Sequence, residues 1–113
     1  MKSKNNEISF ENEKEAKILL EESRKRIDEI DNELCDLISE RTSLAKGIVF
    51  SKQYLGMPIY DESREKAVHE KIEKLAKEKD LDVVIIDQIV NMLTILSKNE
   101  QKEILRRNVD GQY

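Results

Sequence analysis

The stretch that decides the fold is residues 24–54, which read RKRIDEIDNELCDLISERTSLAKGIVFSKQY. Through it and just before it, apolar residues recur at the spacing of one helical face: Leu20, Ile27, Ile30, Leu34, Leu37, Leu44 and Ile48. No helix-breaking run occurs before Gly56, and a lone Gly47 costs a helix only about 1 kcal/mol relative to alanine. With Asn12 as a candidate cap, the pattern predicts one continuous helix over residues 13–54.

Such a helix is too long to be buried by its own chain. At 1.5 Å per residue it spans about 60 Å, whereas a compact domain of this length measures roughly 26 Å across or slightly more. Its apolar stripe therefore needs a second chain, and the sequence predicts an intertwined, homodimeric helical bundle.

Two further helices follow a loop at residues 54–59. Asp61 is a candidate cap for the first, which ends near residue 79 or 80, and Asp82 is a candidate cap for the second, which runs to about Leu105. Their apolar faces consist of Val68, Ile72, Leu75 and Ala76, and of Ile86, Ile89, Leu93 and Leu96. We therefore expect an all-α fold of three helices, one of them very long, in a domain over residues 13–105, with a flexible tail at 1–12 and a polar tail at 106–113.

Composition narrows the functional classes. Charged residues make up 39% of the chain and aromatic residues 4%, which is typical of solvated helices, and the net charge of −4 argues against nucleic acid as a partner. No apolar run approaches the roughly 20 residues of a membrane span, and the first ten residues lack the apolar core of a signal peptide. The single cysteine, Cys35, lies next to Leu34 on the apolar stripe and is interpreted as a reduced core residue. A cytoplasmic protein that binds no membrane is expected.

Charged residues occupy positions of the apolar stripe where the helical period calls for apolar ones. Arg41 follows Leu37 by four residues and precedes Leu44 by three, so its guanidinium lies on the face that otherwise packs. Lys52 lies within about 20° of the same face and about 16 Å further along the axis, so these two cations can hold one small anion between them. The alternative is that the Arg41 side chain extends along the apolar surface to place its guanidinium in solvent, or pairs with an acid on another helix.

Arg24 lies too far away to share that ligand, because it precedes Arg41 by about 25 Å along the helix. If two long helices pair antiparallel about a twofold axis, the Arg24 end of one chain approaches the Lys52 end of the other, and each site receives an arginine from the partner. The alternative is a solvated charge within the basic run at residues 24–26.

The two shorter helices also carry polar residues at one end of their apolar faces. Asp61, Arg64 and Glu65 extend the face of the first toward its start, and Ser97 and Gln101 continue the face of the second. Each could be an ordinary capping, ion-paired or exposed residue. Together they favour a shared polar pocket inside a helical bundle.

The chemistry of such a pocket is limited. His69 lies beside Glu70 on a charged helix and is interpreted as solvated surface, and Cys35 has no base one turn away, so we find no nucleophile with a base. The acids lack metal-ligand spacing and there is no glycine-rich phosphate loop, so no metal and no cofactor is expected. Cations with one amide, one hydroxyl and an acid suit a dicarboxylate whose reaction needs only orientation and stabilisation of developing negative charge.

Taken in order, these residues resemble the all-helical chorismate mutases. The matching positions are the run R-x2-I-D-x2-D-x2-L-x2-L-x3-R from Arg24 to Arg41, then Lys52, then P-x2-D-x2-R-E from Pro58 to Glu65, then Ser97 and Gln101. The resemblance covers roughly residues 18–105. It implies the Claisen rearrangement of chorismate to prephenate, on the route to phenylalanine and tyrosine, without a metal or a covalent intermediate.

The resemblance also implies roles for the cations and their neighbours. Arg41 would bind a substrate carboxylate within its own chain, Arg24 would bind a carboxylate in the partner's site, and Ser97 would contact a carboxylate. Lys52 would contact a carboxylate and the ether oxygen of the breaking C–O bond.

The remaining roles concern that oxygen and the ring hydroxyl. Gln101 would be the second donor to the ether oxygen, which an amide can be at any ordinary pH. Glu65 and Asp61 would hold the ring hydroxyl, and Arg64 would sit beside Glu65 at the pocket.

Two alternatives stay open on the sequence alone. The first is an isochorismate pyruvate lyase of the same fold, against which the D-x-x-R-E run at residues 61–65 favours the mutase. The second is a non-enzymatic helical dimerisation module whose stripe cations make interchain ion pairs. The chain is too short to include the dehydratase, dehydrogenase or synthase domains fused to some relatives, so we expect a monofunctional enzyme or an excised domain.

Overall fold

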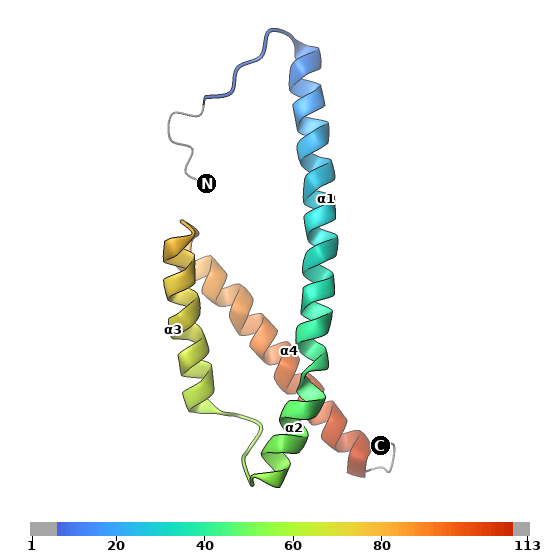
Figure 1. Cartoon of the computed structure of the whole chain (residues 1–113), viewed down its shortest axis with the longest axis vertical. Coiled ribbons are helices and arrows are strands. Elements are labelled where there is room, and N and C mark those ends of the chain that lie inside the picture. Colours follow the sequence, from blue (N-terminus) through green and yellow to red (C-terminus); the bar gives the residue numbers. More distant parts are fainter. Residues whose placement is uncertain (1–6, 110–113) are drawn as a thin grey trace. The chain divides into compact units, whose positions relative to one another are not determined.

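The computed structural model describes residues 7–109, which form only helices, turns and loops (Figure 1). The helices are α1 (Glu13–Ser43), α2 (Ala45–Tyr54), α3 (Glu62–Glu78) and α4 (Val83–Val109). The prediction of an all-α fold is confirmed, and α1 with α2, taken as one long bent helix, accounts for the first of the three predicted helices. By its internal contacts the chain divides into two units, Met1–Ser39 and Glu40–Tyr113. In the described residues, no helix is both long enough and apolar enough to span a bilayer.

The start of α1 is fixed by the predicted cap. The Asn12 Oδ1 atom accepts a hydrogen bond of 3.0 Å from the Glu15 backbone N–H, and the Glu15 carboxylate accepts one of 3.0 Å from the backbone N–H of Glu11. The arrangement resembles a capping box, except that Glu15 reaches back to the N–H of the residue before the cap rather than to that of the cap itself.

The predicted continuous helix is wrong in one respect, because it is interrupted at Leu44. The Ser43 hydroxyl donates a 2.6 Å hydrogen bond to the Glu40 carbonyl, which would otherwise accept from the Leu44 N–H. The Leu44 N–H bonds instead to the Arg41 carbonyl at 3.3 Å, a tighter i to i−3 step. This break starts α2 at Ala45 and leaves Arg41 in the last turn of α1.

Two helices end in the same left-handed turn. After α2, Gly56 has a φ of 69°, its N–H bonds to the Gln53 carbonyl, and the Met57 N–H bonds to the Lys52 carbonyl at 2.7 Å. After α3, Asp80 has a φ of 60°, its N–H bonds to the Lys77 carbonyl, and the Leu81 N–H bonds to the Ala76 carbonyl at 2.8 Å. Both are Schellman motifs, and the first reverses the chain so that the following loop returns toward α2.

The starts of α3 and α4 follow the predicted caps, but the end of α4 does not follow the prediction. Asp61 accepts from the Arg64 N–H at 3.1 Å, and Asp82 accepts from the Ile85 N–H at 3.0 Å. However, α4 runs to Val109 rather than to about Leu105. Residues 106–109 are therefore helical, and the rest of the predicted C-terminal tail, like residues 1–6, lies outside the described residues.

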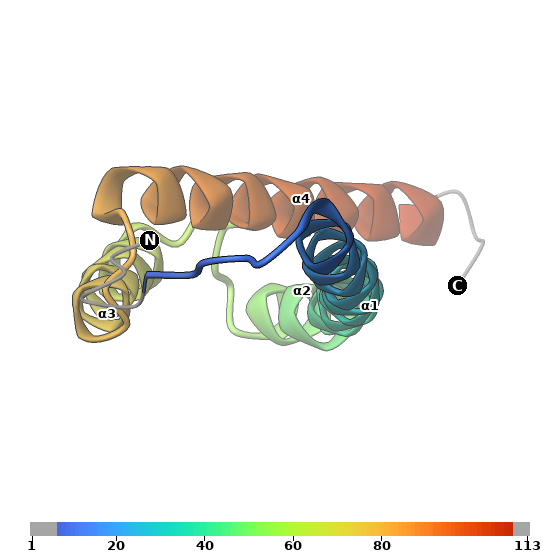
Figure 2. The ribbon, with the colours of Figure 1, turned by 90° about the horizontal axis from the view of Figure 1, so that it is seen from above.

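The second unit has a core of its own. α4 packs against both α2 and α3, which lie on the same side of it in Figure 2. One cluster joins Ala45 and Val49 of α2 to Ile104 of α4, and Ala76 of α3 and Val90 of α4 are also buried. The predicted inner face of α4 is partly wrong, because Ile89 and Leu96 are exposed in the single chain.

α1 behaves differently, since none of its 31 residues is buried in the single chain. Its predicted apolar stripe is present but uncovered, with Leu37 61% exposed and Ile27 55% exposed. Cys35 is exposed as well, so its interpretation as a core residue is wrong for the chain alone.

Candidate active site

One pocket of about 650 Å³ collects most of the predicted site residues. It is lined from the last turn of α1, from α2 and the loop after it, and from α3 and α4, all within the second unit. The predicted residues that line it are Arg41, Lys52, Asp61, Arg64, Glu65, Ser97 and Gln101. Its volume lies inside the range of roughly 300–1,000 Å³ that is usual for small-molecule sites.

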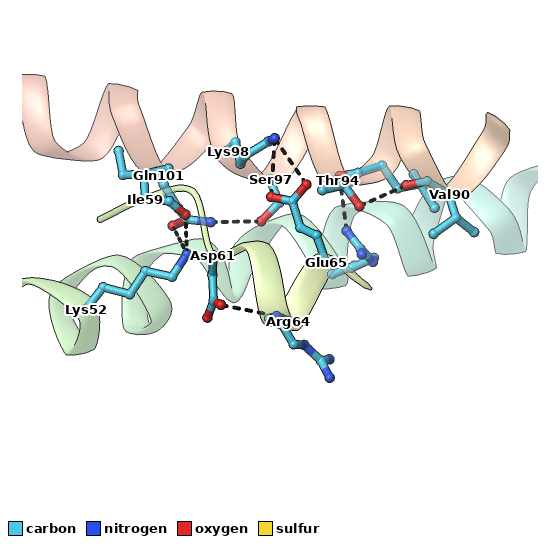
Figure 3. A network of polar contacts seen from close by, with 12 residues as sticks. Lys52, Ile59, Asp61, Arg64, Glu65, Val90, Thr94, Ser97, Lys98 and Gln101 are labelled. Atoms are coloured by element: carbon cyan, nitrogen blue, oxygen red, sulfur yellow. Dashed lines mark hydrogen bonds and ion pairs between the residues drawn. The ribbon is translucent and has the colours of Figure 1, made fainter. Parts of the chain in front are cut away.

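Lys52 and Gln101 meet in this pocket from different helices (Figure 3). The Lys52 ammonium, in the last turn of α2, donates to the Gln101 Oε1 atom at 3.1 Å and to the Ile59 carbonyl at 2.6 Å. The Ile59 carbonyl is brought there by the loop that Gly56 reverses. Because an ammonium has three N–H donors, one remains for a ligand.

The ammonium also fixes which way the Gln101 amide points. An ammonium can only donate, so the amide oxygen faces Lys52 and the Nε2 group faces away, donating to the Ser97 hydroxyl at 3.3 Å. Gln101 is 3% exposed, so its amide is held by packing as well as by hydrogen bonds. The second Nε2 N–H is a donor that a ligand in the pocket can use.

Arg41 reaches the same pocket from the end of α1. Its Nη1 group donates to the Leu93 carbonyl of α4 at 3.1 Å. The alternative, that Arg41 pairs with an acid on another helix, is wrong in the single chain, because its partner is a backbone carbonyl. The guanidinium keeps its full charge and four further N–H groups.

Asp61 and Arg64 line the pocket in different ways. The Asp61 carboxylate is occupied as the cap of α3, where it accepts from the Arg64 N–H and, at 3.2 Å, from the Ser63 hydroxyl. Figure 3 shows the Arg64 guanidinium directed away from the network that joins Lys52 to Gln101. Arg64 is adjacent to Glu65 as expected, but it does not point with it.

Sequence analysis missed some polar residues of the pocket, of which the most informative is Lys98. Its ammonium lies 3.3 Å from the Glu65 carboxylate, and both side chains line the pocket. Thr94, which also lines the pocket, was missed too. The signal was available, because residues 94, 97, 98 and 101 share one face of a helix.

His69 lies outside this pocket, and its interpretation as solvated surface is wrong. Its Nδ1 atom is in contact with the Asp87 carboxylate of α4, and the two side chains are 33% and 45% exposed. This pair joins α3 to α4 and contributes to packing rather than to the pocket.

The charges of the pocket suit an anionic ligand. Four cationic and two anionic side chains line it, a surplus of two positive charges in a chain whose net charge is −4. In residues 7–109, no three His, Cys, Asp or Glu side chains are arranged to hold a metal ion. The site can therefore bind a small dianion and offer it neutral and cationic donors at defined positions.

Arg24 belongs to the other unit and is not among these lining residues. Its predicted place is in the pocket of a partner chain.

Fold and pocket together describe a small, all-helical domain whose cationic pocket suits a small anion. Residues 23–102 match the model of the chorismate mutase type II family, and the chain belongs to that family. Over 86 residues, 76% of this chain and 87% of the relative, it is 46% identical to the chorismate mutase of Methanocaldococcus jannaschii. Over 59 residues, 52% of this chain, it is 46% identical to the bifunctional chorismate mutase/prephenate dehydratase of Aquifex aeolicus, of which it covers 16%.

The predicted family is thereby confirmed. Membership and the identity to a chorismate mutase over most of the chain favour an enzyme, an isomerase, over a non-enzymatic dimerisation module.

Proposed function

We propose that this chain catalyses the rearrangement of chorismate to prephenate as a homodimer whose two pockets each take Arg24 from the partner. The observation that carries the proposal is the pair of donors at one end of the pocket. Lys52 and Gln101, from different helices, are held 3.1 Å apart, and each keeps an N–H for a ligand.

The reaction needs little more than this arrangement. In a Claisen rearrangement one C–O bond breaks as one C–C bond forms, without a nucleophile or a proton transfer. Negative charge grows on the ether oxygen of the breaking bond, and donors aimed at that oxygen lower the barrier. The Lys52 ammonium and the Gln101 amide supply two such donors, and neither depends on a change of protonation.

The other residues serve binding and orientation. Arg41 takes a carboxylate of the substrate by means of the N–H groups not used on Leu93, with Ser97 as a further donor. Glu65, with Asp61 at the start of α3, accepts the ring hydroxyl. Holding the dicarboxylate in its reactive conformer accounts for part of the rate, since the reaction then becomes a matter of alignment.

The proposed homodimer is supported by the exposed apolar stripe of α1. The stripe is exposed along its length in the single chain, and a second α1 of the same sequence would cover it. A twofold pairing would also carry Arg24 to the partner's pocket. We place the enzyme in the cytoplasm, where its single cysteine would stay reduced.

The direct test is turnover of chorismate and, in parallel, of isochorismate by the purified protein. We expect prephenate from chorismate and little pyruvate from isochorismate. Lys52→Ala should lower kcat by roughly 100- to 1,000-fold, because that side chain acts on the transition state. Lys46→Ala, an exposed lysine on the same helix that does not line the pocket, is the control.

Prephenate formation that Lys52→Ala leaves intact would contradict the assigned role of Lys52. A protein that turns over isochorismate and not chorismate is a lyase, and the proposal would be wrong.

A further inference from the structure

Lys98 and Glu65 form an ion pair in the wall of the pocket, and nothing in the proposed reaction yet uses the lysine. The Lys98 ammonium lies 3.3 Å from each of the two Glu65 oxygens, so it bridges the carboxylate. The two side chains are only 26% and 20% exposed. The pair is therefore better shielded from solvent than an ordinary surface ion pair.

A third residue helps to hold the ammonium in place. The Lys98 Nζ atom lies 5.1 Å from the centre of the Tyr60 ring, within the distance of a cation–π contact. Tyr60 belongs to the loop after α2, Glu65 to α3 and Lys98 to α4. The ammonium thus lies between a carboxylate and an aromatic face contributed by two other segments.

The pair changes the electrostatics of the pocket. A carboxylate that faces a dianion repels it, and this repulsion is strong where solvent is partly excluded. With Lys98 bound to it, Glu65 presents an acceptor oxygen with its charge balanced. Without Lys98, the surplus of two positive charges among the lining residues falls to one.

The ion pair also limits the positions of the Glu65 oxygens. A carboxylate has about four acceptor sites, and the ammonium occupies those on one side. The remaining acceptor sites are those a ligand in the pocket can reach, since Glu65 and Lys98 both line it.

We infer that Lys98 is a positioning residue for Glu65: it balances and orients the carboxylate, so that Glu65 can accept a hydroxyl hydrogen bond next to a dianion. This inference rests on the proposed function, because it presupposes a dianionic substrate with a hydroxyl group. Lys98 acts through Glu65 and does not touch the reacting atoms.

A double-mutant cycle tests it. Lys98→Met, Glu65→Gln and the double variant are compared with the unsubstituted enzyme for kcat, KM and thermal midpoint. We expect Lys98→Met to raise KM by about 10-fold or more with a smaller effect on kcat, because it weakens ground-state and transition-state binding alike. Lys98→Arg, which keeps the charge, should recover most of that loss.

The decisive comparison is in the Glu65→Gln background. A neutral glutamine keeps an acceptor oxygen but needs no charge balance, so there Lys98→Met should change KM by less than about 3-fold. Lys102→Met, an exposed lysine one turn further along α4, is the matched control and should behave as the unsubstituted enzyme.

Each outcome of these measurements either supports the role of Lys98 or overturns it. A KM unchanged by Lys98→Met overturns the inference, as does an equal rise in KM in the Glu65→Gln background, which would mean that Lys98 binds substrate itself. A fall in thermal midpoint with KM unchanged would make Lys98 structural only. These results leave the proposed function intact, whereas absence of chorismate turnover in the unsubstituted protein would overturn both.

Discussion

The two units of the chain differ in whether their apolar residues are buried in the single chain. In the unit from Glu40 on, residues of α2 and α4 pack until Ala45, Val49 and Ile104 are 3% exposed or less. In α1 every residue keeps part of its surface, although the helix has an apolar stripe. One unit is stabilised by its own contacts, and the other carries a face that only contact with another surface would bury.

The difference bears on function. The pocket lies entirely in the self-contained unit, whereas Arg24 lies on the uncovered helix. In the proposed dimer, the same contact that covers the apolar stripe completes the site.

The largest effect is expected from a charge placed on the apolar stripe of α1. Leu34 is 49% exposed in the single chain, so Leu34→Asp should be harmless to a monomer but should separate a dimer whose interface it enters. We expect a monomer by analytical ultracentrifugation and the loss of nearly all mutase activity.

Asn32→Asp supplies the matched control, since the same residue is then placed on the opposite face of the same helix. It should leave both mass and activity unchanged. A Leu34→Asp protein that stays dimeric and active would show that the stripe is not the interface.

The next prediction concerns the shared site. Arg24→Ala and Arg41→Ala should each be nearly inactive as pure proteins. If each pocket uses Arg41 of one chain and Arg24 of the other, a hybrid of the two variants contains one intact pocket. Mixing them after denaturation and refolding should restore up to about a quarter of wild-type activity, given random pairing.

Arg41→Ala mixed with Lys52→Ala is the control for that experiment. Both substitutions then fall in the same chain's share of a pocket, so no hybrid contains an intact site and no activity should return. Recovery in this control, or none with Arg24→Ala, would contradict a site shared across the twofold.

Much of the fold was predictable, because helix starts are encoded locally. Asn12, Asp61 and Asp82 each cap the helix that follows, as their positions indicated. The break at Leu44 was not predictable, since it depends on the Ser43 hydroxyl bonding a carbonyl, one of several local options for serine. The inner face of α4 was predicted partly wrongly. That helix has apolar residues on two sides, and only tertiary packing selects the side that is buried.

The site residues also divide into those that the local sequence indicates and those that only tertiary contacts reveal. Its members were predictable wherever a polar residue interrupted an apolar face, as at Arg41, Lys52 and Gln101. Lys98 was missed because a lysine beside other polar residues resembles a solvated charge, and its partners come from two other segments. Outside the site, the contact of His69 was missed for the same reason, since its partner Asp87 lies on the next helix.

A smaller effect, on the free energy of unfolding, tests whether the second unit is stabilised by its own contacts. Gly56 has a φ of 69°, which an L-residue with a side chain adopts at a cost of about 1–2 kcal/mol. Gly56→Ala should lower the free energy of unfolding by that amount. It should also raise KM, because this turn brings the Ile59 carbonyl to Lys52.

Gly47→Ala is the matched substitution, since Gly47 is helical and a Cβ atom there meets nothing within 4 Å. It should stabilise the protein by about 0.5–1 kcal/mol. Because the second unit is stabilised by its own contacts, both substitutions should change the free energy of unfolding of the Leu34→Asp monomer by the same amounts. A monomer in which neither has any effect would show that this unit too depends on the partner.

The smallest expected effect concerns the part of α4 beyond its predicted end. A hydrogen bond from Arg106, together with the charges of Arg106 and Arg107, lowers the pKa of the Glu103 carboxyl from its usual 4.5. A lowered folded-state pKa contributes stability above the unfolded value, and that stability is lost as pH falls through the folded value. Glu103→Gln should therefore lower the thermal midpoint slightly at pH 7, by less than about 2 °C, and the gap should close as the pH falls below 4.5 and through the lowered folded-state pKa. A Glu103→Gln gap that persisted at low pH would mean that these pairs do not hold the last turns of α4.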